Sequence, residues 1–108
     1  MDNLVLDYVR GDALYRSLSI PNRILVAFYI MSNGGMESVS GSEIREAMEG
    51  EFADDREFRR GIRYVLDSTE LRKTGPEKDY MDSDFRLNEN MKESMGNFFR
   101  KAFDKSSL

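Results

Sequence analysis

The sequence predicts an α+β fold that is mostly helical and forms one domain-sized unit. Three observations predict it. Apolar residues recur at helical spacing through most of the chain, the spacing changes to strand-like alternation around a Gly-Pro turn at 75–76, and 108 residues leave room for about one core. With 40% hydrophobic and 33% charged residues, the composition is typical of a globular protein.

The N-terminal third predicts short helical turns followed by a longer buried helix. Residues 1–18 carry two apolar clusters separated by Gly11 and Asp12, which predicts a helical extension with a break. Ser19 is an N-cap residue type and Pro21 is tolerated in a first helical turn, so a helix should begin there. The Asn-Gly-Gly sequence at 33–35 should end that helix, because these residues accept the left-handed conformation.

The next segment predicts a short strand and a second helix. Residues 36–39 alternate apolar and polar side chains over a strand-like stretch. Ser40 and Glu43 have the spacing of a capping box, in which the serine hydroxyl accepts from the glutamate amide while the carboxylate reaches back. Apolar residues follow at helical spacing, so we expect a helix that stops near Gly50.

A third helix is predicted over 55–68, with a cationic face. Asp54 and Asp55 can cap it and complement its dipole. Its apolar positions gather on one side and are Phe58, Ile62, Val65, Leu66 and Thr69. The opposite side carries Arg56, Arg59, Arg60 and Arg63, with Tyr64 and Asp67 at its flank. Arginine matches phosphate and the edge of guanine through paired hydrogen bonds, whereas the alternative is a solvated face paired with nearby acids.

The rest of the chain predicts a hairpin and a final helix. Residues 71–74 and 80–87 alternate as strands and 75–78 form the turn, so Phe85 and Leu87 should share a face. Asn90 can cap a helix with the most extended apolar stripe of the chain. The stripe consists of Met91, Met95, Phe98, Phe99, Ala102 and Phe103.

The charges are unevenly distributed along the chain. The net charge is −4, but residues 56–78 hold seven basic and four acidic side chains, a local net charge of +3. Residues 37–55, just before them, hold seven acidic side chains against a single arginine. The local field and not the total charge is what a docking surface presents to a partner.

This order of elements resembles the winged helix-turn-helix family of DNA-binding regulators. The resemblance is carried by the apolar helix at 24–28, the capped entry at 39–44, the arginine-rich helix at 56–65 and the hairpin at 71–76. It implies a winged helix, with a three-helix core and a small β-hairpin wing over 19–88, between added N- and C-terminal helices at 1–18 and 89–108. It also implies a dimeric transcriptional regulator that binds double-stranded DNA. A cytoplasmic location is expected by default, because the N-terminus lacks the basic start of a signal peptide and the longest apolar stretch, 24–31, is too short to span a membrane.

In such proteins the second helix of the helix-turn-helix lies in the major groove and the wing contacts the backbone. Carried over by position, the resemblance implies that the DNA-binding residues are Arg56, Arg59, Arg60, Arg63 and Tyr64 on the helix, with Arg72, Lys73 and Lys78 in a wing over 71–80. Two features depart from the pattern. Glu43, Glu46 and Glu49 would lie near the DNA backbone, and Gly61 costs its helix about 1 kcal/mol relative to alanine unless it permits close packing.

The C-terminal stripe has two interpretations. It can complete the chain's own core, or it can form the contact of a homodimer, because a small core holds only some of these rings and an exposed patch of them would aggregate. We expect the dimer interface to consist of Met91, Met95, Phe98, Phe99 and Phe103. The alternative function is a winged-helix module that binds a protein partner and not DNA, which the net charge of −4 favours.

Catalysis and metal binding are not expected. The sequence has no cysteine and no histidine, the side chains that most often act as nucleophile, as general base near neutral pH or as transition-metal ligand. Asp79, Asp82 and Asp84 lack the spacing and the glycine of a calcium loop. A carboxylate-dependent enzyme would need a cluster of acids that the sequence does not show. We therefore expect no cofactor, no metal and no membrane span.

Overall fold

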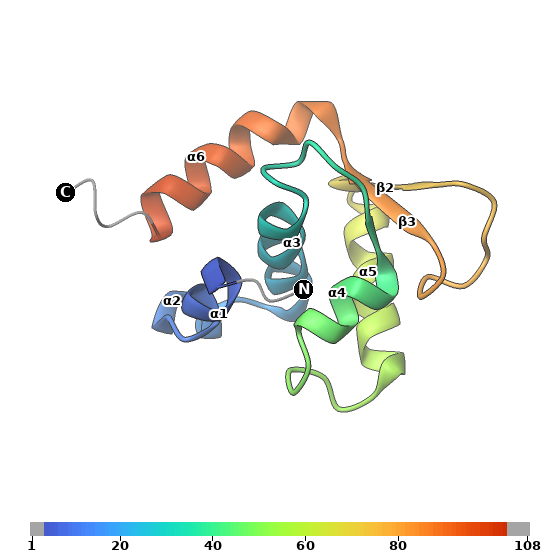
Figure 1. The fold of residues 1–108 in the computed structure, drawn as a ribbon, viewed down its shortest axis with the longest axis horizontal. Coiled ribbons are helices and arrows are strands. Elements are labelled where there is room, and N and C mark those ends of the chain that lie inside the picture. Colours follow the sequence, from blue (N-terminus) through green and yellow to red (C-terminus); the bar gives the residue numbers. More distant parts are fainter. Residues whose placement is uncertain (1–3, 104–108) are drawn as a thin grey trace.

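The computed structural model describes residues 4–103, with every side chain in that range except that of Phe103. The described chain is an α+β fold and mostly helical, as expected (Figure 1). No helix within residues 4–103 has both the length and the apolar character that crossing a bilayer requires. The elements in order are α1 (Leu4–Arg10), α2 (Ala13–Ser17), α3 (Ile20–Met31), β1 (Val39–Ser40), α4 (Gly41–Ala47), α5 (Asp55–Asp67), β2 (Leu71–Thr74), β3 (Asp84–Leu87), a 3-10 turn (Glu89–Met91) and α6 (Lys92–Phe103).

The predicted break after the first helix and the predicted cap of α3 are both present. Asp12 lies between α1 and α2 and caps α2, because its carboxylate accepts a hydrogen bond from the amide of Leu14 at 2.8 Å. The hydroxyl of Ser19 caps α3 in the same way. After α3, Asn33 has a φ of 56° and Gly34 a φ of 74°, so the chain leaves the helix through the left-handed conformation. These boundaries follow from contacts between residues that are close in sequence.

The next two helices, α4 and α5, also begin at predicted caps. The predicted capping box is present at the start of α4, because Ser40 and Glu43 bond each other's backbone amide. The carboxylate of Asp54 accepts from the amide of Glu57 at 2.9 Å and caps α5. Residues 48–54 connect the two helices.

The three strands form one antiparallel sheet in the order β1-β3-β2. Val39 lies opposite Phe85, and Leu71 lies opposite Leu87. All four side chains are buried, so one face of this small sheet covers the helices. The predicted shared face of Phe85 and Leu87 is confirmed.

The prediction of a strand over 80–87 with a turn at 75–78 is wrong at its start. The strand begins at Asp84, and residues 75–83 form one long loop at an end of the long axis in Figure 1. The start of α4 captures this loop, because the amide of Gly41 donates to the carbonyl of Ser83 at 2.9 Å and the amide of Ser42 donates to that of Met81 at 3.0 Å. Backbone groups bonded to a helix terminus are unavailable to a β-ladder.

Two further boundaries differ from the sequence expectation. Thr69 lies past the end of α5 with a φ of 61° and is exposed, so it is not one of that helix's apolar positions. Asn90 does not cap the last helix, because residues 89–91 form a 3-10 turn and α6 starts at Lys92. Met91, the last residue of this turn, packs against the larger core cluster.

The core consists of two adjoining clusters. The larger joins α3, α4 and α5 to the sheet, and Ile24, Phe28, Phe58 and Phe85 are all fully buried in it. The smaller joins α1 and α2 to α3 and the end of α6. Gly61 allows α3 and α5 to approach closely, because a Cβ there would lie 2.6 Å from Cδ1 of Ile24. The helix packing therefore explains a glycine that helix propensity alone disfavours.

Candidate nucleic-acid interface

The exposed side of α5 holds two arginines that pair with no residue in the described part of the chain. Phe58, Ile62 and Val65 fix the orientation of the helix, because their side chains are completely buried. Arg56 and Arg60 lie on the solvent side and are exposed. Within residues 4–103 neither guanidinium bonds or pairs with another group of the chain. Both are therefore available to an external anion.

The other two arginines of this face have carboxylate partners. Nε and Nη2 of Arg59 each lie 3.3 Å from a different oxygen of Asp79, a residue of the β2–β3 loop. Arg63 lies 3.9 Å from Asp67 one turn further along α5, but both side chains are 74% exposed, so this pair is weak. Arg59 thus joins α5 to the loop, whereas Arg63 stays available.

Asp79 is held ionised by its neighbours. The backbone amide of Met81 donates to its carboxylate at 3.0 Å, and Arg59 adds two charge-assisted hydrogen bonds. The amide first and the guanidinium second lower the pKa of Asp79 below its ordinary value. Asp79 therefore keeps its negative charge at neutral pH and neutralises Arg59.

The predicted wing cations lie on and beyond β2. Arg72 and Lys78 are exposed and, among residues 4–103, have no partner in the chain. Lys73 is half-buried, and its ammonium group donates to the carbonyls of Gly75 and Glu77. Lys73 therefore shapes the loop, while the other two present free charge. Tyr64, the remaining predicted contact, is 61% exposed on α5.

The acids of α4 are partly engaged within the protein. The Glu43 carboxylate takes part in the capping box, and Arg45 pairs with Asp55 at 3.2 Å. Glu46 and Glu49 are exposed. Of the three glutamates that do not fit the family resemblance, these two therefore keep exposed carboxylates.

The structure distributes the predicted dimer stripe between the core and the surface. Met95 is 7% exposed and packs in the larger core cluster, with Met91 packed against it. Phe99 packs against the smaller cluster, its ring centroid 5.5 Å from that of Tyr29. Phe98 is 39% exposed, and the side chain of Phe103 lies outside the described part of the chain. A dimer contact at this stripe remains a prediction.

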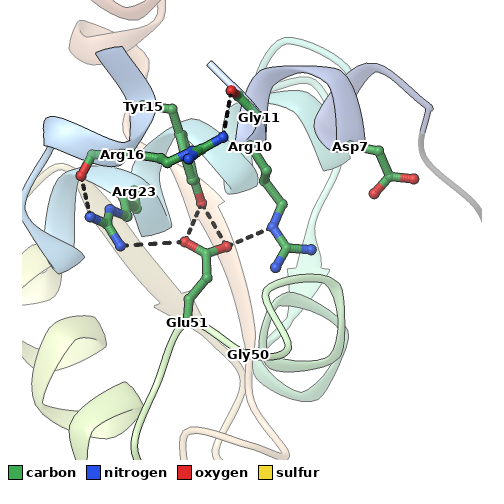
Figure 2. Close-up of a pocket in the computed structure, with 8 residues that line it drawn as sticks. All are labelled: Asp7, Arg10, Gly11, Tyr15, Arg16, Arg23, Gly50 and Glu51. Atoms are coloured by element: carbon green, nitrogen blue, oxygen red, sulfur yellow. Dashed lines mark hydrogen bonds and ion pairs between the residues drawn. The ribbon is translucent and has the colours of Figure 1, made fainter. Parts of the chain in front are cut away.

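A second polar cluster was missed by the sequence analysis. The hydroxyl of Tyr15 donates one bifurcated hydrogen bond to the two carboxylate oxygens of Glu51, a residue of the α4–α5 connection, at 2.8 and 2.9 Å. The same carboxylate pairs with Arg10 at 2.8 Å (Figure 2). Burial first, and the adjacent carboxylate second, raise the pKa of Tyr15, so the tyrosine remains a proton donor. These residues lie on α1, α2 and the connection, and no rule of sequence spacing relates them.

Comparison with family models, with curated proteins and with solved structures gives no match for this chain. No group of three or more acidic side chains within residues 4–103 is arranged to hold a metal ion. The function is therefore inferred from the positions of the charged side chains described above.

Proposed function

We propose that the chain is a winged-helix protein that binds double-stranded DNA, with α5 in the major groove and the β2–β3 loop at the neighbouring backbone. The order of elements from α3 to β3 and the antiparallel pairing of β2 with β3 support the proposal, because the family resemblance implies this order and a β-hairpin wing. An α-helix fits the major groove, which is about 12 Å wide. In this arrangement the buried side of α5 packs against α3 and the sheet.

The observation that carries the proposal is the unpaired state of Arg56 and Arg60. Elsewhere in the described chain the acidic surroundings engage Arg10, Arg45 and Arg59 in ion pairs. The protein is anionic overall, yet no residue of 4–103 pairs with these two arginines of α5 or with Arg72 and Lys78 in the adjoining hairpin. These four cations present a local site for a polyanion. Phosphates of the DNA backbone are anions that arginine and lysine side chains bind through charge-assisted hydrogen bonds.

Salt dependence gives the quantitative test. If Arg56, Arg60, Arg72 and Lys78 each neutralise one phosphate, the logarithm of the association constant should fall with log salt with a slope of about −3.6 for each protein chain. Changing Arg56→Ala and Arg60→Ala together should reduce the steepness by about 2 and weaken binding by about 10- to 100-fold at low salt. Fluorescence anisotropy with a labelled duplex of random sequence measures both quantities.

The matched control removes two cations from the other end of the molecule. Arg100 and Lys101 are exposed on α6, and the double change Arg100→Ala and Lys101→Ala alters the net charge equally. We expect this control to retain the wild-type slope. Equal losses in the two double variants would assign any binding to general charge, and an absence of binding at low salt would reject the proposal.

The proposal includes a homodimer, in which two copies of α5 meet successive major grooves about 34 Å apart. Phe98, the exposed aromatic ring of the C-terminal stripe, is the residue around which we place the contact. Met95 acts in this arrangement as core packing behind it, because it is already buried in its own chain.

A second candidate function is a module that binds a protein partner. It is favoured by Leu4, Val5 and Tyr8 of α1, which are 79%, 55% and 69% exposed and supply apolar surface of the kind found at protein interfaces. This alternative predicts that the protein does not bind DNA at low salt. It also predicts that the double change Arg56→Ala and Arg60→Ala leaves binding of the protein partner unchanged. The DNA titration above therefore separates the two candidates.

A further inference from the structure

A cavity lies between the N-terminal helices and the connection that precedes α5. It has a volume of about 460 Å³, within the range of small-molecule sites. Figure 2 shows the side chains that line it, from α1, α2, α3 and the α4–α5 connection. Its charged residues are Asp7, Arg10, Arg16, Arg23 and Glu51, so the lining holds three guanidinium groups and two carboxylates.

Two of the three arginines are engaged around Glu51. Arg10 pairs with the Glu51 carboxylate and donates to the carbonyls of Ala47 and Glu49 at 2.9 and 2.7 Å. Arg23 lies 3.8 Å from the same carboxylate, donates to the carbonyl of Leu18 at 3.0 Å, and also bonds a carbonyl of α2. Glu51 is only 10% exposed, and it neutralises one charge of the two.

Arg16 is the third arginine, and it lacks an anionic partner. Its Nη2 donates to the carbonyl of Gly11 at 3.0 Å, and no carboxylate in residues 4–103 pairs with it. Asp7, the other acid of the lining, points away from Glu51 and the arginines in Figure 2. The cavity therefore combines a net positive charge with N–H donors that the chain does not use.

We propose that this cavity binds a small anion bearing a phosphate or carboxylate group. Arg16 supplies the principal contact, since a guanidinium can hold either group through two parallel hydrogen bonds. Arg10, Arg23 and Tyr15 form the rigid wall, because Glu51 already fixes their positions. These three side chains already bind one carboxylate, that of Glu51. The ligand would be a second anion in the same site.

The cavity lies where a bound ligand could affect the position of α5. Gly50 and Glu51 line it, and Asp54 caps α5 a few residues later. An anion that holds Arg16 against this wall would fix the α4–α5 connection more firmly to α1 and α2. This last step rests on the proposed DNA binding, whereas binding of the anion does not.

The test uses the full chain without DNA, so that its result is independent of the function proposed above. Isothermal titration calorimetry with inorganic phosphate, and separately with malonate, should give heat of binding from a single class of site, with sodium chloride at matched ionic strength giving none. The tighter of the two anions identifies the ligand class. Arg16→Ala should weaken that binding by about tenfold, as expected for a lost charge-assisted hydrogen bond.

Two controls locate the site. Arg100→Ala removes an exposed arginine of α6 that bonds Asn97, and Lys101→Ala removes the exposed lysine next to it. Both should bind phosphate as the wild type does. Wild-type affinity in Arg16→Ala, equal losses in all three variants, or no binding of either anion would each overturn the proposal.

Discussion

Replacing Gly41 with alanine is expected to lower the free energy of unfolding by about 3 kcal/mol, the upper part of the usual range for overpacking. A Cβ at this position would lie 1.9 Å from the carbonyl oxygen of Tyr80 and 3.1 Å from Cα of Met81. Both are backbone atoms, so no side-chain rotation relieves the clash. The loop must move away from α4, which breaks the hydrogen bonds from Gly41 and Ser42 to that loop.

Urea denaturation followed by circular dichroism measures this effect, with Gly11→Ala as the matched control. A Cβ on Gly11 would meet the carbonyl oxygen of Tyr8 at 3.5 Å, an ordinary contact distance. The control should therefore unfold at close to the wild-type midpoint. A Gly41→Ala protein as stable as the wild type would mean that the β2–β3 loop does not pack on the start of α4.

Changing Glu51→Gln is the second substitution with a large expected effect, a loss of about 2 kcal/mol of stability. Removing one member of a buried ion pair typically costs 3–5 kcal/mol, and the partly exposed arginines here recover some hydration, which reduces the loss. The side chains of Arg10 and Arg23 are 27% and 23% exposed, against 10% for Glu51. The amide keeps a hydrogen bond from Tyr15 but leaves both guanidinium groups without their charge partner.

The neighbouring Glu49 provides the control. Its side chain is exposed, and only its backbone carbonyl contacts Arg10. Thermal unfolding should therefore give the same midpoint for Glu49→Gln as for the wild type, and a midpoint several degrees lower for Glu51→Gln. Equal midpoints for all three proteins would show that the Glu51 cluster contributes nothing to stability.

The parts of the fold that the sequence predicted are those fixed by neighbours in the chain. The capping box of Ser40 and Glu43, the Asp54 cap and the left-handed end at Asn33 each involve residues within four positions of one another. The start of β3 was wrong, because the amides of Gly41 and Ser42 bind residues about forty positions away. Alternating side chains cannot reveal such a capture.

The candidate site divides in the same way. Helical periodicity placed Arg56 and Arg60 on the exposed side of α5, and the structure has them there. It gave no means to distinguish them from Arg59, whose partner Asp79 comes from the long loop. The sequence does not predict the Glu51 cluster, because Glu51 is one of several acids in an acidic stretch. Its cationic partners, Arg10 and Arg23, come close to it only in the folded chain.

The most direct test of the central claim is an amide NMR titration of the labelled protein with a short duplex at low salt. We expect the largest chemical-shift changes in α5 and in residues 71–79 and little change in α6. Changes concentrated in α1, α2 or α6, or no changes at all, would contradict the assignment of α5 as the DNA-binding helix.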